Sequence, residues 1–185
     1  MIPLMIILAI IVALGATNVN ADFTVYIGKD NDITDVGVTF SSNELQIHDH
    51  ALLSCSDMGH TVSISASNIN DASKGRWACD GCSADAPRNW IVDRFEMYNR
   101  DDAVGHGTDH PFPLFDRATG AVTLYGTGDG NYAMLDINNT FLGTCNRPSK
   151  PQEMDCWELI SATFLTHVFT CISDLVPNKR LWVPE

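Results

Sequence analysis

Histidine pairs are the residues whose type and spacing first suggest chemistry. His48 and His50 are separated by one residue, so in a β-strand both side chains point to one face, with Cα atoms about 7 Å apart. Two imidazoles placed in this way can chelate zinc or copper. His106 and His110, in a predicted long exposed loop over 100–113, could supply further ligands. These histidines are candidate metal ligands; the competing interpretation is two unrelated, solvent-exposed pairs.

Other catalytic patterns are weaker. Asp93 and Glu96 could form a carboxylate pair of the kind that glycosidases use, but three positions apart in a strand they point to opposite faces. The sequence contains no Gly-x-Ser-x-Gly motif of the serine hydrolases. We therefore assign no catalytic residue, and we expect a protein that is not an enzyme and needs no cofactor.

Composition and charge restrict the class of partner. The chain has 185 residues, which allows one compact domain. Lys and Arg number 11 against 23 Asp and Glu, giving a net charge of −12. Binding to nucleic acid depends on clustered Lys and Arg that contact phosphates, so this balance argues against nucleic acid as a partner.

The first 21 residues predict a signal peptide. An apolar core of about 11 residues, 4–14, is too short for a membrane-spanning helix, which needs roughly 20. Small residues occupy positions −3 and −1 of a cleavage site after Ala21, and cleavage after Gly15 or Ala16 is the alternative. An uncleaved anchor is the competing interpretation. We expect a secreted, extracellular protein with no membrane association after signal cleavage.

The predicted export determines how the six cysteines should be interpreted. In an oxidising compartment an even number of cysteines predicts disulfides, and 15 pairings are possible. The motif Cys79-x-x-Cys82 has two competing interpretations, a redox motif or half of a zinc site. The cysteines that we expect to be paired are Cys55, Cys79, Cys82, Cys145, Cys156 and Cys171.

Alternation of apolar and polar residues predicts the fold. It is clear over 23–27, 36–41 and 61–66, and weaker over 45–54, 90–98, 121–125 and 132–137. Turn-forming residues separate these stretches at intervals of about 10 residues, which favours an antiparallel sandwich or barrel. We predict an all-β domain over 22–176, an antiparallel β-barrel or sandwich stapled by disulfides, followed by a loosely held tail over 177–185.

Two further segments need separate interpretation. The apolar spacing over 156–172 fits a helix, but its Thr, Val, Phe and Ile content favours a strand buried on both faces, which we predict. Asn138-Asn139-Thr140 is an N-glycosylation sequon at a predicted turn, so we expect a glycan on Asn138.

Two stretches carry a resemblance to a known family. Leu53-Ser-Cys55-Ser, followed at a distance by Arg76-Trp77-Ala-Cys79 and an aromatic strand, is similar to one family motif. The polar segment 145–156, which lies between two cysteines and precedes a Thr- and Phe-rich stretch, is similar to another. The chain thus resembles the secreted fungal family named for the Alternaria major allergen.

The resemblance implies an antiparallel barrel and specific disulfides. The implied pairs are Cys55–Cys79 and Cys145–Cys156, with Cys82 and Cys171 as an additional pair. An early cysteine that the family can use for an intermolecular link is absent, so a homodimer would not be covalent.

Two function classes follow from these observations. The first is a non-enzymatic effector or allergen-like protein whose exposed loops bind a host extracellular protein or a small ligand. The alternative is a secreted hydrolase or metal-dependent enzyme that uses His48, His50, His106 and His110.

Overall fold

The computed structural model describes residues 21–33, 39–60, 62–66, 77–82, 87–99, 114–116, 120–157 and 161–178. Two short 3-10 helices interrupt the strands, η1 (Cys55–His60) and η2 (Pro87–Asn89). The strands are β1 (Ala21–Ile33), β2 (Thr39–His48), β3 (Val62–Ala66), β4 (Trp77–Asp80), β5 (Arg94–Asn99), β6 (Gly120–Gly128), β7 (Asn131–Asp136), β8 (Phe141–Asn146), β9 (Glu153–Trp157) and β10 (Ser161–Ser173). The predicted signal peptide and the predicted loop over 100–113, with His106 and His110, lie outside these residues.

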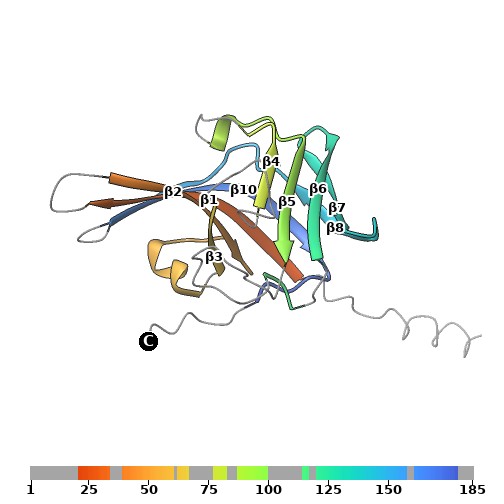
Figure 1. Ribbon diagram of the computed structural model, residues 1–185, viewed down its shortest axis with the longest axis horizontal. Coiled ribbons are helices and arrows are strands. Elements are labelled where there is room, and N and C mark those ends of the chain that lie inside the picture. The colour runs from red at the N-terminus through yellow and green to blue at the C-terminus, as the bar shows by residue number, and fades with distance from the viewer. Residues whose placement is uncertain are drawn as a thin grey trace, which may run out of the picture.

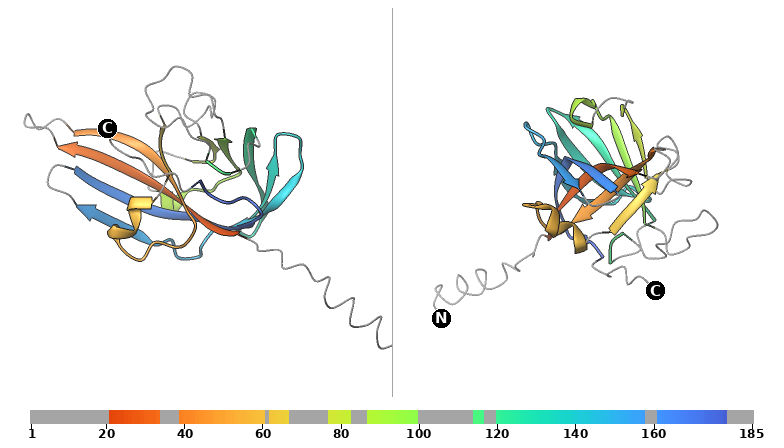
Figure 2. Two further views of the ribbon diagram at one scale, coloured as in Figure 1. Left: turned by 90° about the horizontal axis from the view of Figure 1, so that it is seen from below. Right: turned by 90° about the vertical axis from the view of Figure 1, so that its left-hand side faces the viewer.

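The strands form one antiparallel sheet that curls into a nearly closed barrel (Figures 1 and 2). Neighbouring strands follow the order β3-β2-β1-β10-β8-β7-β6-β5-β4, and β9 pairs with β10. This architecture confirms the predicted all-β antiparallel class and identifies the barrel rather than the sandwich.

Two long strands, β1 and β10, organise the barrel. They pair from Ala21 opposite Ser173 to Asp32 opposite Ser161. The second edge of β10 is shared, because β8 pairs with residues 170–173 and β9 pairs with residues 162–166. One end of β1, β2 and β10 projects beyond the rest of the barrel, on the left of Figure 1.

The predicted strand over 156–172 is confirmed by β10 from Ser161 onward, whereas Cys156 and Trp157 belong to β9 and 158–160 lie outside the described residues. Phe169 is fully buried on the inner face, where its ring centroid lies 5.3 Å from that of Phe95 on β5 and 4.9 Å from that of Tyr132 on β7. Leu165 and His167, on the outer face, are also buried. A strand that is buried on both faces shows no simple alternation, and this explains why its apolar spacing also fits a helix.

One continuous apolar cluster occupies the interior of the barrel. Its side chains come from most strands of the barrel and from segments between the strands, as expected for a small barrel filled by its own side chains. The largest members are Phe23, Ile27, Leu45, Ile47, Trp77, Trp90, Phe95, Met97, Phe115, Tyr132, Met134 and Phe169.

Several predicted boundaries were wrong. The stretches 36–41 and 45–54 were predicted as separate strands, whereas β2 runs continuously from Thr39 to His48 and the chain then leaves the sheet. The strand predicted over 90–98 begins only at Arg94. The predicted loose tail is fixed at its start, because Pro177 forms a β-bridge with Phe115.

The six cysteines form three disulfides, as expected from their number, but the pairing implied by the family resemblance is wrong. The observed pairs are Cys55–Cys156, Cys79–Cys82 and Cys145–Cys171. The β8–β10 register places Cys145 directly opposite Cys171, with Cα atoms 4.0 Å apart. Three disulfides indicate an oxidising environment.

Candidate functional site

The predicted same-face histidine pair does not form. His48 ends β2 on the outer face of the sheet, is only 3% exposed, and its Nε2 lies 3.1 Å from Gln46 Oε1. His50 follows the strand, is exposed, and contacts the Asp49 carboxylate. The prediction assumed that the strand continued through residue 50. Among the described residues, no group of three or more His, Cys, Asp or Glu side chains could hold a metal ion.

His48 instead belongs to an aromatic cluster on the outer face. The ring of Tyr26 on β1 lies edge-on to His48, 5.4 Å between centroids, and stacks on His167 of β10 at 4.9 Å. A register shift between Val25 and Tyr26 permits this arrangement, because it places Val25 opposite Phe169 and Tyr26 opposite His167.

Burial controls the protonation of this cluster. Desolvation lowers the pKa of His48 to about 4, with a further contribution from the nearby His50. Desolvation also lowers the pKa of His167, although the Phe169 carbonyl, 3.0 Å from its Nε2, opposes that shift. Both imidazoles are therefore neutral at pH 7, with a hydrogen-bond acceptor available to each ring.

The loop of residues 49–58 covers the cluster. Leu52 points inward and is fully buried against Tyr26 and Leu165. Its backbone N–H donates to the Tyr26 hydroxyl at 2.9 Å, and its carbonyl accepts from Gln152 Nε2 at 3.0 Å. Thr24 Oγ1 donates to the carbonyl of His50 at 2.6 Å. These bonds attach the start of the loop to the sheet.

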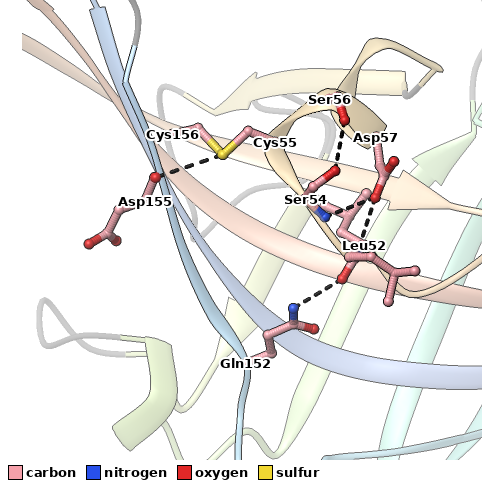
Figure 3. Close-up of a disulfide and its surroundings, with 9 residues drawn as sticks. Leu52, Ser54, Cys55, Ser56, Asp57, Gln152, Asp155 and Cys156 are labelled. Atoms are coloured by element: carbon pink, nitrogen blue, oxygen red, sulfur yellow. Dashed lines mark hydrogen bonds between the residues drawn. A yellow bond between two sulfur atoms is a disulfide. The ribbon is translucent and has the colours of Figure 1, made fainter.

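Asp57 fixes the turn that follows. Its Oδ2 accepts from the backbone N–H groups of Leu53 and Ser54, each at 2.9 Å (Figure 3). Its own N–H donates to the Ser54 carbonyl at 3.1 Å. The two backbone hydrogen bonds lower the pKa of the Asp57 carboxyl. The turn is therefore held by a carboxylate that is ionised at pH 7.

The Cys55–Cys156 disulfide joins the loop to β9, as Figure 3 shows. It links residues 101 positions apart in the sequence, and the Cys55 sulfur also lies 3.7 Å from the carbonyl oxygen of Asp155. A covalent bond and five hydrogen bonds to sheet or turn groups thus restrain a loop of about ten residues.

Leu53 stands out on this restrained loop. Its side chain is 86% exposed, although both of its neighbours have fixed backbones. The charged residues around it are acidic: Asp49 and Asp155 are exposed, and Asp57 is ionised. Neither 44–58 nor 151–157 contains a Lys or Arg residue.

A second loop has the same design. Ile91 is 81% exposed between buried Trp90 and Val92, and the Tyr132 hydroxyl donates to the Val92 carbonyl at 2.9 Å. The Arg147 guanidinium donates to the carbonyls of Trp90 and Pro87. A surface hollow of about 350 Å³ lies beside this loop, between residues 90–93 and the β6–β7 turn.

The remaining predicted site residues are dispersed. Asp93 precedes β5, and its carbonyl accepts from the Gly126 N–H, whereas Glu96 lies within β5. Asn138 is exposed at the turn between β7 and β8, which is where the sequence placed it.

Sequence reasoning missed Leu53 as a site residue. The available signal was a pair of leucines near the end of the stretch 45–54, followed by Ser54-Cys-Ser-Asp57, where a Ser and an Asp three positions apart predict a local turn. The exposure of one leucine and the burial of the other depend on tertiary packing.

Comparison with known proteins gives no relative. No family model matches the chain, and no curated protein or solved structure matches it significantly. Within the described part of the chain, no helix is long and apolar enough to cross a membrane.

Proposed function

We propose that this chain is a secreted, non-enzymatic binding protein that contacts a partner protein through the loop of residues 49–58, with Leu53 as the anchor. The observation that carries the proposal is an 86%-exposed leucine on a loop restrained by the Cys55–Cys156 disulfide and by hydrogen bonds to Tyr26, Gln152 and Asp57. A large apolar side chain in this position has no packing role within the barrel.

Restraint is what makes this exposure useful for binding. A mobile loop must lose conformational freedom when it binds, at a cost of about 0.5–1.5 kcal/mol for each immobilised side chain. A loop whose backbone is already fixed avoids most of the further free-energy cost of ordering the backbone. Interfaces also concentrate their free energy in a few residues that fill apolar pockets on the partner.

The surrounding charges describe the partner further. Asp49, Asp57 and Asp155 place negative charge around Leu53, and the whole chain carries a net charge of −12. Electrostatic complementarity therefore favours a partner with an apolar pocket bordered by Lys and Arg. Weaker and slower association at high salt is the expected consequence.

Kinship with the Alternaria major-allergen-like family, with its fungal origin and effector role, is a separate part of the proposal. The antiparallel barrel, which the resemblance implies, supports it, whereas no family model or solved structure matches the chain. The disulfide pairing, which differs from the implied one, argues against it.

The test is capture of extracellular proteins on the immobilised mature chain. We expect a specific protein to be retained by the wild type and by Ile137→Ser, a variant at a 63%-exposed residue of another surface, and to be reduced tenfold or more with Leu53→Ser. Equal retention by all three proteins would refute the role of Leu53.

A further inference from the structure

The turn that carries the Asn138 sequon has a well-defined backbone. Asp136 Oδ1 accepts from the N–H groups of Asn138 at 2.8 Å and Thr140 at 2.7 Å, and Asn139 adopts a left-handed conformation with φ of 60°. Asn138, Asn139 and Thr140 are all exposed. The acceptor asparagine and the hydroxyl residue of the sequon are thus presented together on a fixed turn between β7 and β8.

An apolar patch adjoins this turn. Leu135 of β7 lies directly opposite Phe141 of β8, so the two side chains share one face of the sheet. Ile137, in the turn directly after β7, lies beside Gly120 of β6. Ile137 is 63% and Phe141 62% exposed, and they immediately flank the sequon. We call Leu135, Ile137 and Phe141 the β7–β8 patch.

We propose that Asn138 carries an N-linked glycan whose first sugars cover the β7–β8 patch. In this step the Asn138 side-chain nitrogen forms a bond to C1 of the first N-acetylglucosamine of an oligosaccharide linked to a polyprenyl diphosphate. The bond between C1 and the diphosphate oxygen breaks, the diphosphate leaves with the electron pair, and the amide proton passes to a base of the transferase.

The position of the patch argues that a glycan, rather than a partner protein, covers it. Ile137 directly precedes the acceptor asparagine and Phe141 directly follows the sequon threonine, so any glycan starts between these two members of the patch. Sugar rings have apolar faces that pack on aromatic side chains such as Phe141. A glycan would thereby shield apolar surface that otherwise promotes self-association of a secreted protein.

The proposal rests on the export that the proposed function also assumes, but on a different part of the molecule. The β7–β8 hairpin lies on the right of Figure 1, whereas η1 and the Leu53 loop lie at the lower left. A glycan on Asn138 therefore leaves the Leu53 loop accessible.

The first experiment measures occupancy. The full chain is produced in a secreting eukaryotic cell, and its intact mass is measured before and after treatment with peptide N-glycosidase F. We expect a glycan mass that the enzyme removes, leaving Asp at position 138, in the wild type and in Thr140→Ser, and complete loss of it in Thr140→Ala. An unmodified Asn138 in the secreted wild type would overturn the proposal.

The second experiment tests whether the glycan covers the β7–β8 patch. Binding of an environment-sensitive apolar dye and sedimentation are compared for the glycosylated and the enzymatically deglycosylated chain. We expect deglycosylation to raise dye binding several-fold, or to produce dimers, and Ile137→Ser/Phe141→Ser to abolish the rise. A glycan whose removal changes neither property would overturn the covering role. If Asn138 is unmodified in the secreted wild type and that protein still captures a partner through Leu53, this inference is wrong and the proposed function stands.

Discussion

The barrel interior and the outer cluster under loop 49–58 are stabilised in different ways. The interior is a large apolar cluster in which Phe169 contacts Phe95 and Tyr132. The outer cluster has a small apolar centre of Tyr26, Leu52 and Leu165, to which it adds buried imidazoles and hydrogen bonds. The interior therefore responds mainly to changes in side-chain volume. Disulfides belong to both regions, since Cys145–Cys171 lies in the interior cluster and Cys55–Cys156 fixes the loop over the outer one. The outer cluster also responds to pH through its imidazoles, and pH can therefore separate the two regions.

Removal of the Cys55–Cys156 disulfide gives the largest expected effect. In the chain-entropy model a bridge that closes a loop of about 100 residues stabilises by about 4–5 kcal/mol, against about 2 kcal/mol for a bridge as short as Cys79–Cys82. We expect Cys55→Ser/Cys156→Ser to lower the free energy of unfolding accordingly in urea titrations. The matched control is Cys79→Ser/Cys82→Ser. Equal losses for the two variants would contradict the prediction.

A cavity in the interior comes next. Phe169→Ala removes a ring that contacts two other aromatic residues and should cost about 3–5 kcal/mol, because the barrel wall cannot collapse into the space. Leu52→Ala in the outer cluster should cost about 2 kcal/mol, the low end for a buried leucine, because the apolar centre around Leu52 is small. Urea unfolding monitored by tryptophan fluorescence measures both values. A larger loss for Leu52→Ala would reverse the comparison.

Lower pH should destabilise the outer cluster. The unfolded chain binds a proton at His48 near its ordinary pKa of 6.5, whereas the folded chain binds it only near pH 4, so protonation favours unfolding. The contribution of His48 is complete above pH 6.5 and is lost as the pH falls to 4, a change of about 2–3 kcal/mol. His167 adds to this loss in the same direction.

Variants isolate this effect from the other titrating groups. The pKa of Asp57 is lowered from 3.8, so its contribution is lost only at still lower pH. Between pH 7 and 4, His48→Gln should show a flatter stability profile than the wild type, and His50→Gln, which removes only the smaller contribution to the His48 pKa, should lie closer to the wild type. Parallel profiles for His48→Gln and the wild type would exclude His48 as the titrating group.

The smallest expected effect is at the surface. Arg88 of η2 donates to both carboxylate oxygens of Glu153 on β9 at 2.9 Å, and both side chains are exposed. Arg88→Ala should therefore lower the free energy of unfolding by only about 0.2–1 kcal/mol. Above about 0.5 M salt, where the ion pair is screened, the variant and the wild type should be equally stable. A double-mutant cycle with Glu153→Ala measures the coupling, and a value above 2 kcal/mol would show a role that exposure does not explain.

The fold was predictable because alternation is a local property. The alternating stretches 23–27 and 132–136 lie in strands of the barrel; the second has one buried face, whereas the first is buried on both. Even β10, which is buried on both faces, could be recognised by its content of β-branched and aromatic residues.

The candidate site was not predictable, because it depends on contacts between distant segments and alternation is a local property. His48 is buried and His50 exposed because the chain leaves the sheet after residue 48. The partner of Cys55 depends on β9 lying beside β10, a contact between segments about 100 residues apart. No local pattern contains this information.

The pairing of β1 with β10 has a consequence for biosynthesis. Because the first strand closes against the last, the sheet cannot be completed until almost the whole chain has been synthesised, and folding should be slow. Cys79 can meet Cys82 at once, whereas Cys55 must remain unpaired until Cys156 emerges. During that interval Cys55 is exposed to the nearer cysteines, so correct maturation should depend on a disulfide isomerase in the compartment where the chain folds.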